Sequence, residues 1–261
     1  MHPLTYLFVP GDRPERFDKA ANAGAGAIIL DLEDAVRPEA KPRARDAIGE
    51  WLASHGQHAS RTIVRINDEA DLPFIAQARV QTVMLPKTES AAQVRNVAQT
   101  GAKVIALVET ARGIRAMDEI ADAQGIVRLA FGTIDYAVDI DIAGSEAALV
   151  YPASRMVIAS RCAGLPAPIA GVTPTIDDAG QLRSDVAWER SVGFGAKLVI
   201  HPRQVAIVHD AMRPSDEEVA WARRVITAAE ATQGAVQVDG RMVDRPVIRK
   251  AHAIIERTSL S

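Results

Sequence analysis

Charged side chains come directly after several short apolar runs of this 261-residue chain. Asp31, Glu33 and Asp34 follow one run, Arg65 closes a second, and Glu109 follows a third. Carboxylate oxygens suit Mg²⁺, which proteins usually hold with one or two carboxylates while water and substrate oxygens complete the octahedron. An arginine can bind a substrate carboxylate through two parallel hydrogen bonds. These residue types predict metal-assisted chemistry on a small carboxylic acid.

Each of these residues also has a purely structural interpretation. Glu33, Asp34 and Thr110 are equally suited to cap helices or to lie in solvated loops. Arg65 could form a salt bridge, although a substrate clamp is favoured because the other runs supply acids for a metal. Glu109 follows a strongly apolar run, where a buried charge requires a partner, so a functional role is favoured.

Two further polar residues follow apolar runs. Lys87 could form a Schiff base with a carbonyl substrate, but carboxylates that bind Mg²⁺ make such a base unnecessary. His201 precedes a proline, and the sequence leaves open whether it is a catalytic base or a structural residue.

Short runs rich in β-branched residues recur along the chain, each followed by polar residues and then by a helix-like segment. They are almost continuously hydrophobic, which is typical of parallel strands that are covered on both faces. The predicted strands are Thr5–Val9, Ala27–Leu32, Arg61–Ile66, Thr82–Leu85, Lys103–Val108, Arg128–Phe131, Pro168–Val172 and Ala196–Ile200. The helical patterns between them include Pro14–Ala23, Pro42–Ser54, Ala91–Gln99, Ile114–Ala121, Glu146–Ala163 and Leu182–Ser191.

This alternation of strand and helix predicts an α/β fold, a closed (β/α)₈ TIM barrel. The alternative is an open doubly wound sheet, which would more often carry a glycine-rich nucleotide turn after its first strand. Only Val9-Pro10-Gly11-Asp12-Arg13 stands there, so the barrel is favoured. The chemistry of such barrels lies at the carboxyl ends of the strands, which would bring Asp31, Arg65 and Glu109 to one rim.

The end of the chain departs from the strand–helix repeat. Ser215 and Glu218 form a capping-box pattern that predicts a helix reaching about Gln233. Two short segments, Val236–Val238 and Arg241–Val243, are joined by Asp239-Gly240, which predicts a β-hairpin with a type I′ turn. Pro246 begins a last helix to about Arg257. We therefore predict a catalytic barrel domain over residues 1–212 and a helix–hairpin–helix extension over 213–261 that packs at a subunit interface.

The overall charge and composition exclude several classes of partner. Lysine and arginine total 30 and aspartate and glutamate total 33, so the net charge of −3 does not indicate binding to nucleic acid or to a membrane. Cys162 is the single cysteine, so no intrachain disulfide can form. No apolar run approaches the roughly 18 residues of a membrane-spanning helix, and no secretory signal pattern stands at the start. A cytoplasmic protein is expected.

Several motifs together resemble those of the citrate lyase β-subunit-like and malyl-CoA lyase family. They run in the order of that family along nearly the whole chain. The motifs are Leu7–Ala20, Leu30–Val36 with Lys41 and Ala44-Arg45, Val64–Asn67, Leu85–Glu89, Leu107–Thr110, Phe131–Tyr136 and Gly193–Pro202. One departure is Ala196, where the late motif usually has glycine, which implies a slight backbone shift near the acyl-carrier end.

The resemblance implies a Mg²⁺-dependent carbon–carbon lyase that acts on a 3-hydroxyacyl-CoA such as malyl-, citramalyl- or citryl-CoA. It also implies that the chain forms a homotrimer or hexamer, in which Asp244 of a neighbouring copy completes each site. The residues it implicates are Arg65, Asp244 and Asp31 as catalytic; Arg65, Glu109, Glu33 and Asp34 as substrate-binding; and Glu109 and Asp135 as metal ligands. The charges of Arg13, Arg16 and Lys19 make them the candidates for binding CoA.

Alternatives remain for both the reaction and the cationic cluster. The same enolate chemistry could end in thioester hydrolysis or a malate-synthase-like reaction, a related barrel could cleave free 4-hydroxy-2-keto acids, or the chain could be a subunit that needs an acyl carrier partner. The hydroxyl proton must reach a base, for which Asp244 is the candidate. Arg13, Arg16 and Lys19, with Lys41 and Arg45, could meet CoA phosphates or equally form a solvated helix face.

Overall fold

The computed structural model describes residues 2–143, 146–231 and 236–258 of the chain. Its main feature is a closed barrel of parallel strands in the order β1 to β8. The register Tyr6↔Leu198 between β1 and β8 closes it. The strands are β1 (Thr5–Pro10), β2 (Ala27–Asp31), β3 (Thr62–Arg65), β4 (Thr82–Leu85), β5 (Lys103–Val108), β6 (Ile126–Phe131), β7 (Ile169–Ala170) and β8 (Ala196–Val199). The predicted TIM barrel is confirmed.

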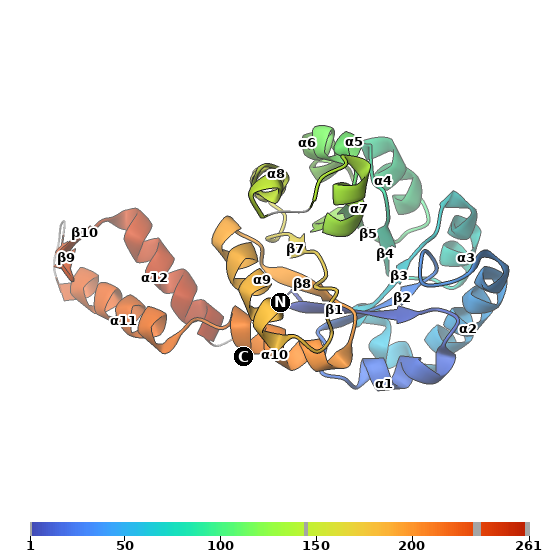
Figure 1. The fold of residues 1–261 in the computed structure, drawn as a ribbon, viewed down its shortest axis with the longest axis horizontal. Helices are drawn as coiled ribbons and strands as arrows, with labels where there is room; N and C mark the ends of the chain where they lie inside the picture. Colours follow the sequence, from blue (N-terminus) through green and yellow to red (C-terminus); the bar gives the residue numbers. More distant parts are fainter. Residues whose placement is uncertain (1, 144–145, 232–235, 259–261) are drawn as a thin grey trace. The chain divides into compact units, whose positions relative to one another are not determined.

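Helices cover the outside of the barrel, and the strands lie at its centre (Figure 1). The helices are η1 (Pro14–Arg16), α1 (Phe17–Ala21), η2 (Pro38–Ala40), α2 (Lys41–Ser54), η3 (Gly56–Arg61), η4 (Glu69–Asp71), α3 (Leu72–Gln77), α4 (Ala91–Ala98), α5 (Ala111–Arg115), α6 (Met117–Ala121), α7 (Thr133–Asp139), α8 (Glu146–Cys162), α9 (Ala179–Val192) and α10 (Pro202–Met212). One set of strand side chains, including Tyr6, Ile29, Ile63 and Ile105, fills the barrel interior. The alternate set is buried under the helices, which explains why the strands are apolar on both faces.

Two predicted elements differ from the observed ones. β7 pairs only over Ile169–Ala170, shorter than the predicted strand, because Pro168 has no N–H to donate. After β7, the Gly171 carbonyl accepts a hydrogen bond from the Lys197 side chain at 2.9 Å instead of continuing the ladder. The helix predicted over residues 114–121 divides into α5 and α6, because the main chain of Ala116 (φ −90°, ψ 9°) leaves the helical region.

The C-terminal elements are α11 (Asp216–Ala231), β9 (Val236–Val238), β10 (Arg241–Val243) and α12 (Arg245–Thr258). The capping box is present, since Glu218 N donates to Ser215 Oγ at 3.1 Å and Ser215 N donates to Glu218 Oε2 at 2.8 Å. The hairpin turn has positive φ at Asp239 (50°) and Gly240 (74°), as a type I′ turn requires. Gln233, the expected end of the first helix, lies outside the described residues.

The chain divides into two compact units, the barrel unit Met1–Val208 and the C-terminal unit His209–Ser261. The C-terminal unit has its own small core, in which Val225 of α11 packs with Val243, Ala251 and Ile254. α11 and α12 run side by side in this unit, with β9 and β10 at one end (Figure 1). Among the described helices, none combines the length and the apolar character needed to cross a membrane.

A buried ion pair ties β7, β8 and α9 together. Lys197 points away from the barrel interior, which its neighbours Ala196 and Leu198 fill, and it is fully buried. Its ammonium group lies 2.5 Å from Glu189 Oε1 on α9. Burial raises the pKa of Glu189 to about 7, although the attraction of Lys197 opposes this shift. The pair therefore fixes the short strand β7 from outside the ladder.

Removal of one partner from this pair should destabilise the barrel unit strongly. Lys197→Met leaves a buried carboxylate without its cation, and we expect a loss of about 3–5 kcal/mol in the free energy of unfolding. Adding Glu189→Gln removes the stranded charge and should recover part of that loss. Urea denaturation measures both, with Lys103→Met at the exposed start of β5 as the control. A loss below about 1 kcal/mol for Lys197→Met would contradict this account.

Candidate active site

Arg65 organises the carboxyl ends of β2 and β3. Asp31 and Arg65 are register partners on these strands. Arg65 Nε lies 2.6 Å from Asp31 Oδ1 and Arg65 Nη2 lies 2.6 Å from Asp31 Oδ2, so the pair is bidentate. Arg65 Nη1 also lies 2.7 Å from Glu33 Oε2. Burial alone would lower the pKa of Arg65, but its hydrogen bonds and proximity to Asp31 and Glu33 raise it, so the guanidinium stays charged.

Lys87, in the turn after β4, binds the other oxygen of Glu33. Its Nζ lies 2.6 Å from Glu33 Oε1. Burial raises the pKa of Glu33, and the attraction of Arg65 and Lys87 opposes that shift. The hydrogen bond to Glu33 raises the pKa of Lys87 in turn. A Schiff-base lysine needs a lowered pKa to be nucleophilic, so this geometry disfavours that role.

Glu109 lies directly after β5 and is almost fully buried, with 2% of its surface exposed. Its Oε1 accepts a hydrogen bond of 2.7 Å from the main-chain N–H of Lys87. Its other face packs against Gly132, where an added Cβ would lie only 2.3 Å from Glu109 Oε2. A glycine is therefore required at the end of β6 if the carboxylate is to keep this position.

The carboxylate of Glu109 is held in conditions that disfavour its charge. Burial, together with the negative charges of Glu33 and Asp135, raises the pKa of Glu109 to about 8, although the Lys87 N–H and Arg65 oppose the shift. Asp135 stands in the first turn of α7, half-buried, three residues after Gly132. Asp31, Glu33, Glu109 and Asp135, which we call the acidic rim, thus outnumber the cations Arg65 and Lys87.

The acidic rim suits a hard divalent cation. Two of its carboxylates, Glu109 and Asp135, influence each other electrostatically and have no cation directly bound in the interactions described above. No group of three or more His, Cys, Asp or Glu side chains converges on a common point within residues 2–143, 146–231 and 236–258. Two protein carboxylates match the usual number for Mg²⁺, which completes its octahedron with water and substrate oxygens.

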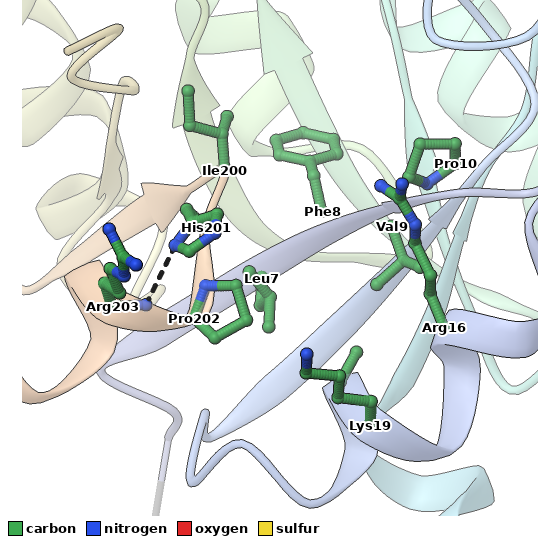
Figure 2. Close-up of a pocket in the computed structure, with 11 residues that line it drawn as sticks. Leu7, Phe8, Val9, Pro10, Arg16, Lys19, Ile200, His201, Pro202 and Arg203 are labelled. Carbon is green, nitrogen blue, oxygen red and sulfur yellow. Dashed lines mark hydrogen bonds between the residues drawn. The ribbon is translucent and has the colours of Figure 1, made fainter. Parts of the chain in front are cut away.

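A cavity of about 560 Å³ opens between the carboxyl ends of β1 and β8. We call it the β1–β8 cavity. Its lining consists of Leu7, Phe8, Val9, Pro10, Arg16, Lys19, Ala20, Ile200, His201, Pro202 and Arg203. Arg16 and Lys19 lie on one side of β1, and His201 and Arg203 lie on the other (Figure 2). Cationic side chains over an apolar floor are suited to a ligand with phosphate groups and an apolar arm.

Phe8 connects this cavity to the acidic rim. Its ring lines the β1–β8 cavity, and the guanidinium carbon of Arg65 lies 4.8 Å from the centre of the same ring. A ligand that occupies the cavity and extends past Phe8 therefore reaches Arg65. The rim and the cavity are therefore neighbours on the two sides of Phe8, and together they form the candidate active site of the barrel unit.

Some of the site residues predicted from the sequence lie outside the hydrogen bonds of the acidic rim and the lining of the β1–β8 cavity. Asp34 is exposed and acts on Glu33 and Lys87 only through its charge. Arg13 is exposed, 3.8 Å from Asp12, and is not among the residues that line the cavity. Asp244 is exposed in the C-terminal unit, where its Oδ1 accepts a hydrogen bond of 3.2 Å from Val247 N near the start of α12.

Two other candidates, Lys41 and Arg45, form contacts within the barrel unit. Lys41 Nζ donates to the carbonyls of Leu32 (2.8 Å) and Glu33 (3.1 Å), and Arg45 Nε lies 2.7 Å from Asp71. Lys41 thus binds the segment after β2, and Arg45 binds Asp71 of η4, contacts that fit neither CoA binding nor a solvated helix face.

Two further residues whose roles the sequence left open also make local contacts. Thr110 caps α5, accepting a hydrogen bond of 3.1 Å from Gly113 N. His201 accepts one of 3.2 Å from Arg203 N while lining the cavity, which favours a structural role over that of a base.

Comparison with known proteins places these features in a family. Residues 4–202 match the HpcH/HpaI aldolase/citrate lyase family, and residues 153–260 match a family described as a carbon–carbon bond lyase of the TIM-barrel fold. The chain belongs to the HpcH/HpaI aldolase/citrate lyase family. The predicted resemblance to citrate lyase β-subunit-like proteins is thereby confirmed, and with it the class of carbon–carbon lyases.

Relatives match over nearly the whole chain. A citrate lyase subunit beta-like protein of Mycobacterium tuberculosis is 40% identical over 97% of this chain and 94% of its own length. A (3S)-malyl-CoA thioesterase of Cereibacter sphaeroides is 31% identical over 97% of this chain and 96% of its own. The crystal structure of the M. tuberculosis protein CitE with magnesium, acetoacetate and coenzyme A superposes with a TM-score of 0.89 at 38% identity, covering 98% of this chain and 97% of that one.

The raised pKa of Glu109 predicts a pH-dependent cost in stability when divalent cations are absent. The unfolded chain loses this proton near pH 4.5, whereas the folded protein keeps it until about pH 8, so stability falls as the pH rises between these values. Glu109→Gln retains an acceptor for Lys87 N–H and removes the titration. In EDTA we expect the variant to match the wild type near about pH 5 and to exceed it by on the order of 3 kcal/mol near about pH 9.

Urea denaturation at several pH values measures this difference. Asp34→Asn, which removes an exposed carboxylate near the same site, is the control. A stability difference between Glu109→Gln and wild type that stays constant with pH would contradict the assignment of a raised pKa to Glu109.

Proposed function

We propose that this protein is a Mg²⁺-dependent carbon–carbon lyase that cleaves or forms a 3-hydroxyacyl-CoA of the malyl-, citramalyl- or citryl-CoA type. The observation that carries the proposal is that Phe8 lines the cationic β1–β8 cavity and also contacts Arg65 of the acidic rim. The rim suits a metal and a keto acid, and the cavity suits a phosphate-bearing carrier. Magnesium and coenzyme A in the similar CitE structure support both assignments.

Each rim residue has a distinct role in this proposal. Glu109 and Asp135 would hold Mg²⁺, while Asp31 and Glu33 keep the Arg65 guanidinium in place. Arg65 has N–H groups beyond those bound to Asp31 and Glu33, because a guanidinium carries five donors. These remaining N–H groups would bind the carboxylate of the part of the substrate that becomes the keto acid. Burial of Arg65, which is 12% exposed, strengthens this attraction.

Cleavage moves one proton and breaks one carbon–carbon bond. A base takes the proton of the 3-hydroxyl group, the bond between the hydroxyl-bearing carbon and the α-carbon of the thioester breaks, and the electron pair passes to the thioester as an enolate. The enolate then takes a proton at carbon to give the shorter acyl-CoA, and the keto acid remains at Arg65. A bound Mg²⁺ supplies Lewis acidity that offsets the negative charge on the keto-acid oxygens.

We assign the base to Asp244 of a second copy of the chain. Asp244 is exposed in the C-terminal unit, so its carboxylate is accessible to another molecule. On α7, which carries Asp135, Ile134 and Val138 are exposed to 47% and 78%, an apolar surface that a second copy could cover. The resemblance to the malyl-CoA lyase branch supports the same arrangement. Assembly as a homotrimer or hexamer stays a prediction.

A thioesterase is the second candidate function. The relative named (3S)-malyl-CoA thioesterase, 31% identical over almost the whole chain, favours it. In that reaction, the same enolate chemistry is followed by hydrolysis of the thioester. Release of free thiol separates the two functions, because only hydrolysis of the thioester produces it.

The assay that tests the proposal uses the purified protein, Mg²⁺ and a panel of malyl-CoA, citramalyl-CoA, citryl-CoA and free 4-hydroxy-2-keto acids. We expect keto acid to be released from one of the CoA esters without free thiol, and EDTA to abolish the reaction. Glu109→Gln and Asp135→Asn should each lower the rate by about 100-fold or more. Free thiol would indicate the thioesterase instead, and full activity in both variants would overturn the metal assignment.

The cationic side of the β1–β8 cavity should contribute to binding rather than to the chemical step. Arg16→Ala and Lys19→Ala each remove one charge from the lining, so we expect the KM for the CoA ester to rise about fivefold with kcat nearly unchanged. Arg13→Ala, outside the lining, should change KM less. Steady-state kinetics at low and high salt measure this, and equal effects of all three substitutions would contradict the placement of the carrier in this cavity.

A mixing experiment tests whether Asp244 acts in the site of another copy. Asp244→Asn should lower activity by about 100-fold or more, as expected for loss of a general base. Coexpression with Glu109→Gln, itself inactive, should form some sites that have both native residues. Random assembly of equal amounts in a ring predicts about one quarter of wild-type activity. A mixture as inactive as its components would contradict a site shared between copies.

A further inference from the structure

Lys87 has an unusual main-chain conformation for a lysine. Its φ is 46°, in the left-handed region. A side chain other than that of glycine or asparagine disfavours this region by about 1 kcal/mol or more. Its side chain is about half exposed, so packing alone does not hold the residue in place. Hydrogen bonds and ion pairs of this turn must offset the cost of this conformation.

Lys87 contacts the acidic rim in two ways at once. Its main-chain N–H donates to Glu109 Oε1 at 2.7 Å, and its side-chain Nζ lies 2.6 Å from Glu33 Oε1. Glu33 is itself held by Arg65 Nη1 at 2.7 Å. The ion pair of the Lys87 side chain therefore connects the turn after β4 to Glu33, which Arg65 already holds. The main chain of the same turn orients Glu109.

Glu109 has little other freedom. Gly132 lies against Oε2, so the carboxylate is confined between the turn that carries Lys87 and the end of β6. A shift in the Lys87 N–H would change the direction in which Oε1 points. Thr88, the next residue, also anchors the turn, since Thr88 N donates to Leu107 O at 3.1 Å and Thr88 Oγ1 donates to Leu85 O at 2.7 Å.

We propose that Lys87 is a positioning residue for the metal-binding carboxylate Glu109. The ion pair with Glu33 holds Lys87 in the left-handed conformation, and this conformation directs the main-chain N–H at Glu109 Oε1. The inference rests on the proposed function to the extent that Glu109 binds a divalent cation. It assigns Lys87 neither a Schiff base nor contact with the substrate.

The sign of one effect distinguishes positioning from simple electrostatics. By Coulomb's law alone, removing the positive charge of Lys87 beside a cation site should tighten the binding of a divalent cation. If Lys87 positions Glu109, the same removal should weaken binding, because the carboxylate loses its fixed orientation. Loss of a residue that supports a metal ligand typically costs 10–100-fold in metal affinity.

Binding of Mn²⁺ alone, measured by electron paramagnetic resonance or calorimetry, tests the inference without any assay of activity. We expect Lys87→Met to weaken Mn²⁺ binding about tenfold. Lys87→Arg, which keeps the charge, and Lys87→Gly, which adopts positive φ without steric cost, should both stay within about threefold of the wild type. Lys103→Met, an exposed lysine at the opposite end of the barrel strands, should bind as the wild type does.

The outcomes separate this inference from the proposed function. Unchanged or tighter Mn²⁺ binding by Lys87→Met, with normal binding by the wild type, would overturn the positioning role alone. Binding by Lys87→Gly as weak as that of Lys87→Met would overturn the part assigned to the main chain. A wild-type protein that binds no Mn²⁺ would overturn the proposed metal site and this inference with it. Circular dichroism confirms that each variant is folded.

Discussion

The ion pairs of Arg65 with Asp31 and Glu33 are the interaction on which the rest of the site depends. They join the ends of β2 and β3, and through Lys87 and Glu109 they extend to the ends of β4 and β5. The barrel buries more carboxylates here than cations, so the rim retains an excess of negative charge. Buried charge without a partner costs stability, and under the proposed function a divalent cation at Glu109 and Asp135 would offset that cost.

In the proposed function, the carrier is recognised in the β1–β8 cavity and the chemistry takes place at the neighbouring acidic rim. The β1–β8 cavity offers cations and apolar surface to a carrier, and Phe8 leads from it to the guanidinium of Arg65. Binding energy from a large carrier can then position a small reacting group beside the metal. The reacting groups of malyl-, citramalyl- and citryl-CoA differ by only a few atoms, so under the proposed function the surroundings of Arg65 and Glu109 would have to select among them.

The sequence predicts most of the barrel because β-branched runs recur with regular spacing and parallel strands bring their carboxyl ends together. That rule correctly grouped Asp31, Glu33, Arg65 and Glu109. It could not show that a main-chain N–H of Lys87 orients Glu109, because the contact depends on one φ angle and not on residue type. The requirement for Gly132 was hidden likewise, since it arises from a close approach of two strand ends. Lys41 and Arg45 show that charge alone does not reveal a partner, because their side-chain partners Asn67 and Asp71 each lie 26 residues further along the chain.

The most direct test of this account is a calorimetric titration of the protein with Mg²⁺. The acidic rim predicts about one ion bound per chain, and loss of that binding by Glu109→Gln, because two carboxylates supply all the protein ligands. Lys103→Met should bind like the wild type. Undiminished Mg²⁺ binding by Glu109→Gln would contradict the account, since the excess of buried negative charge would then not be what holds the metal.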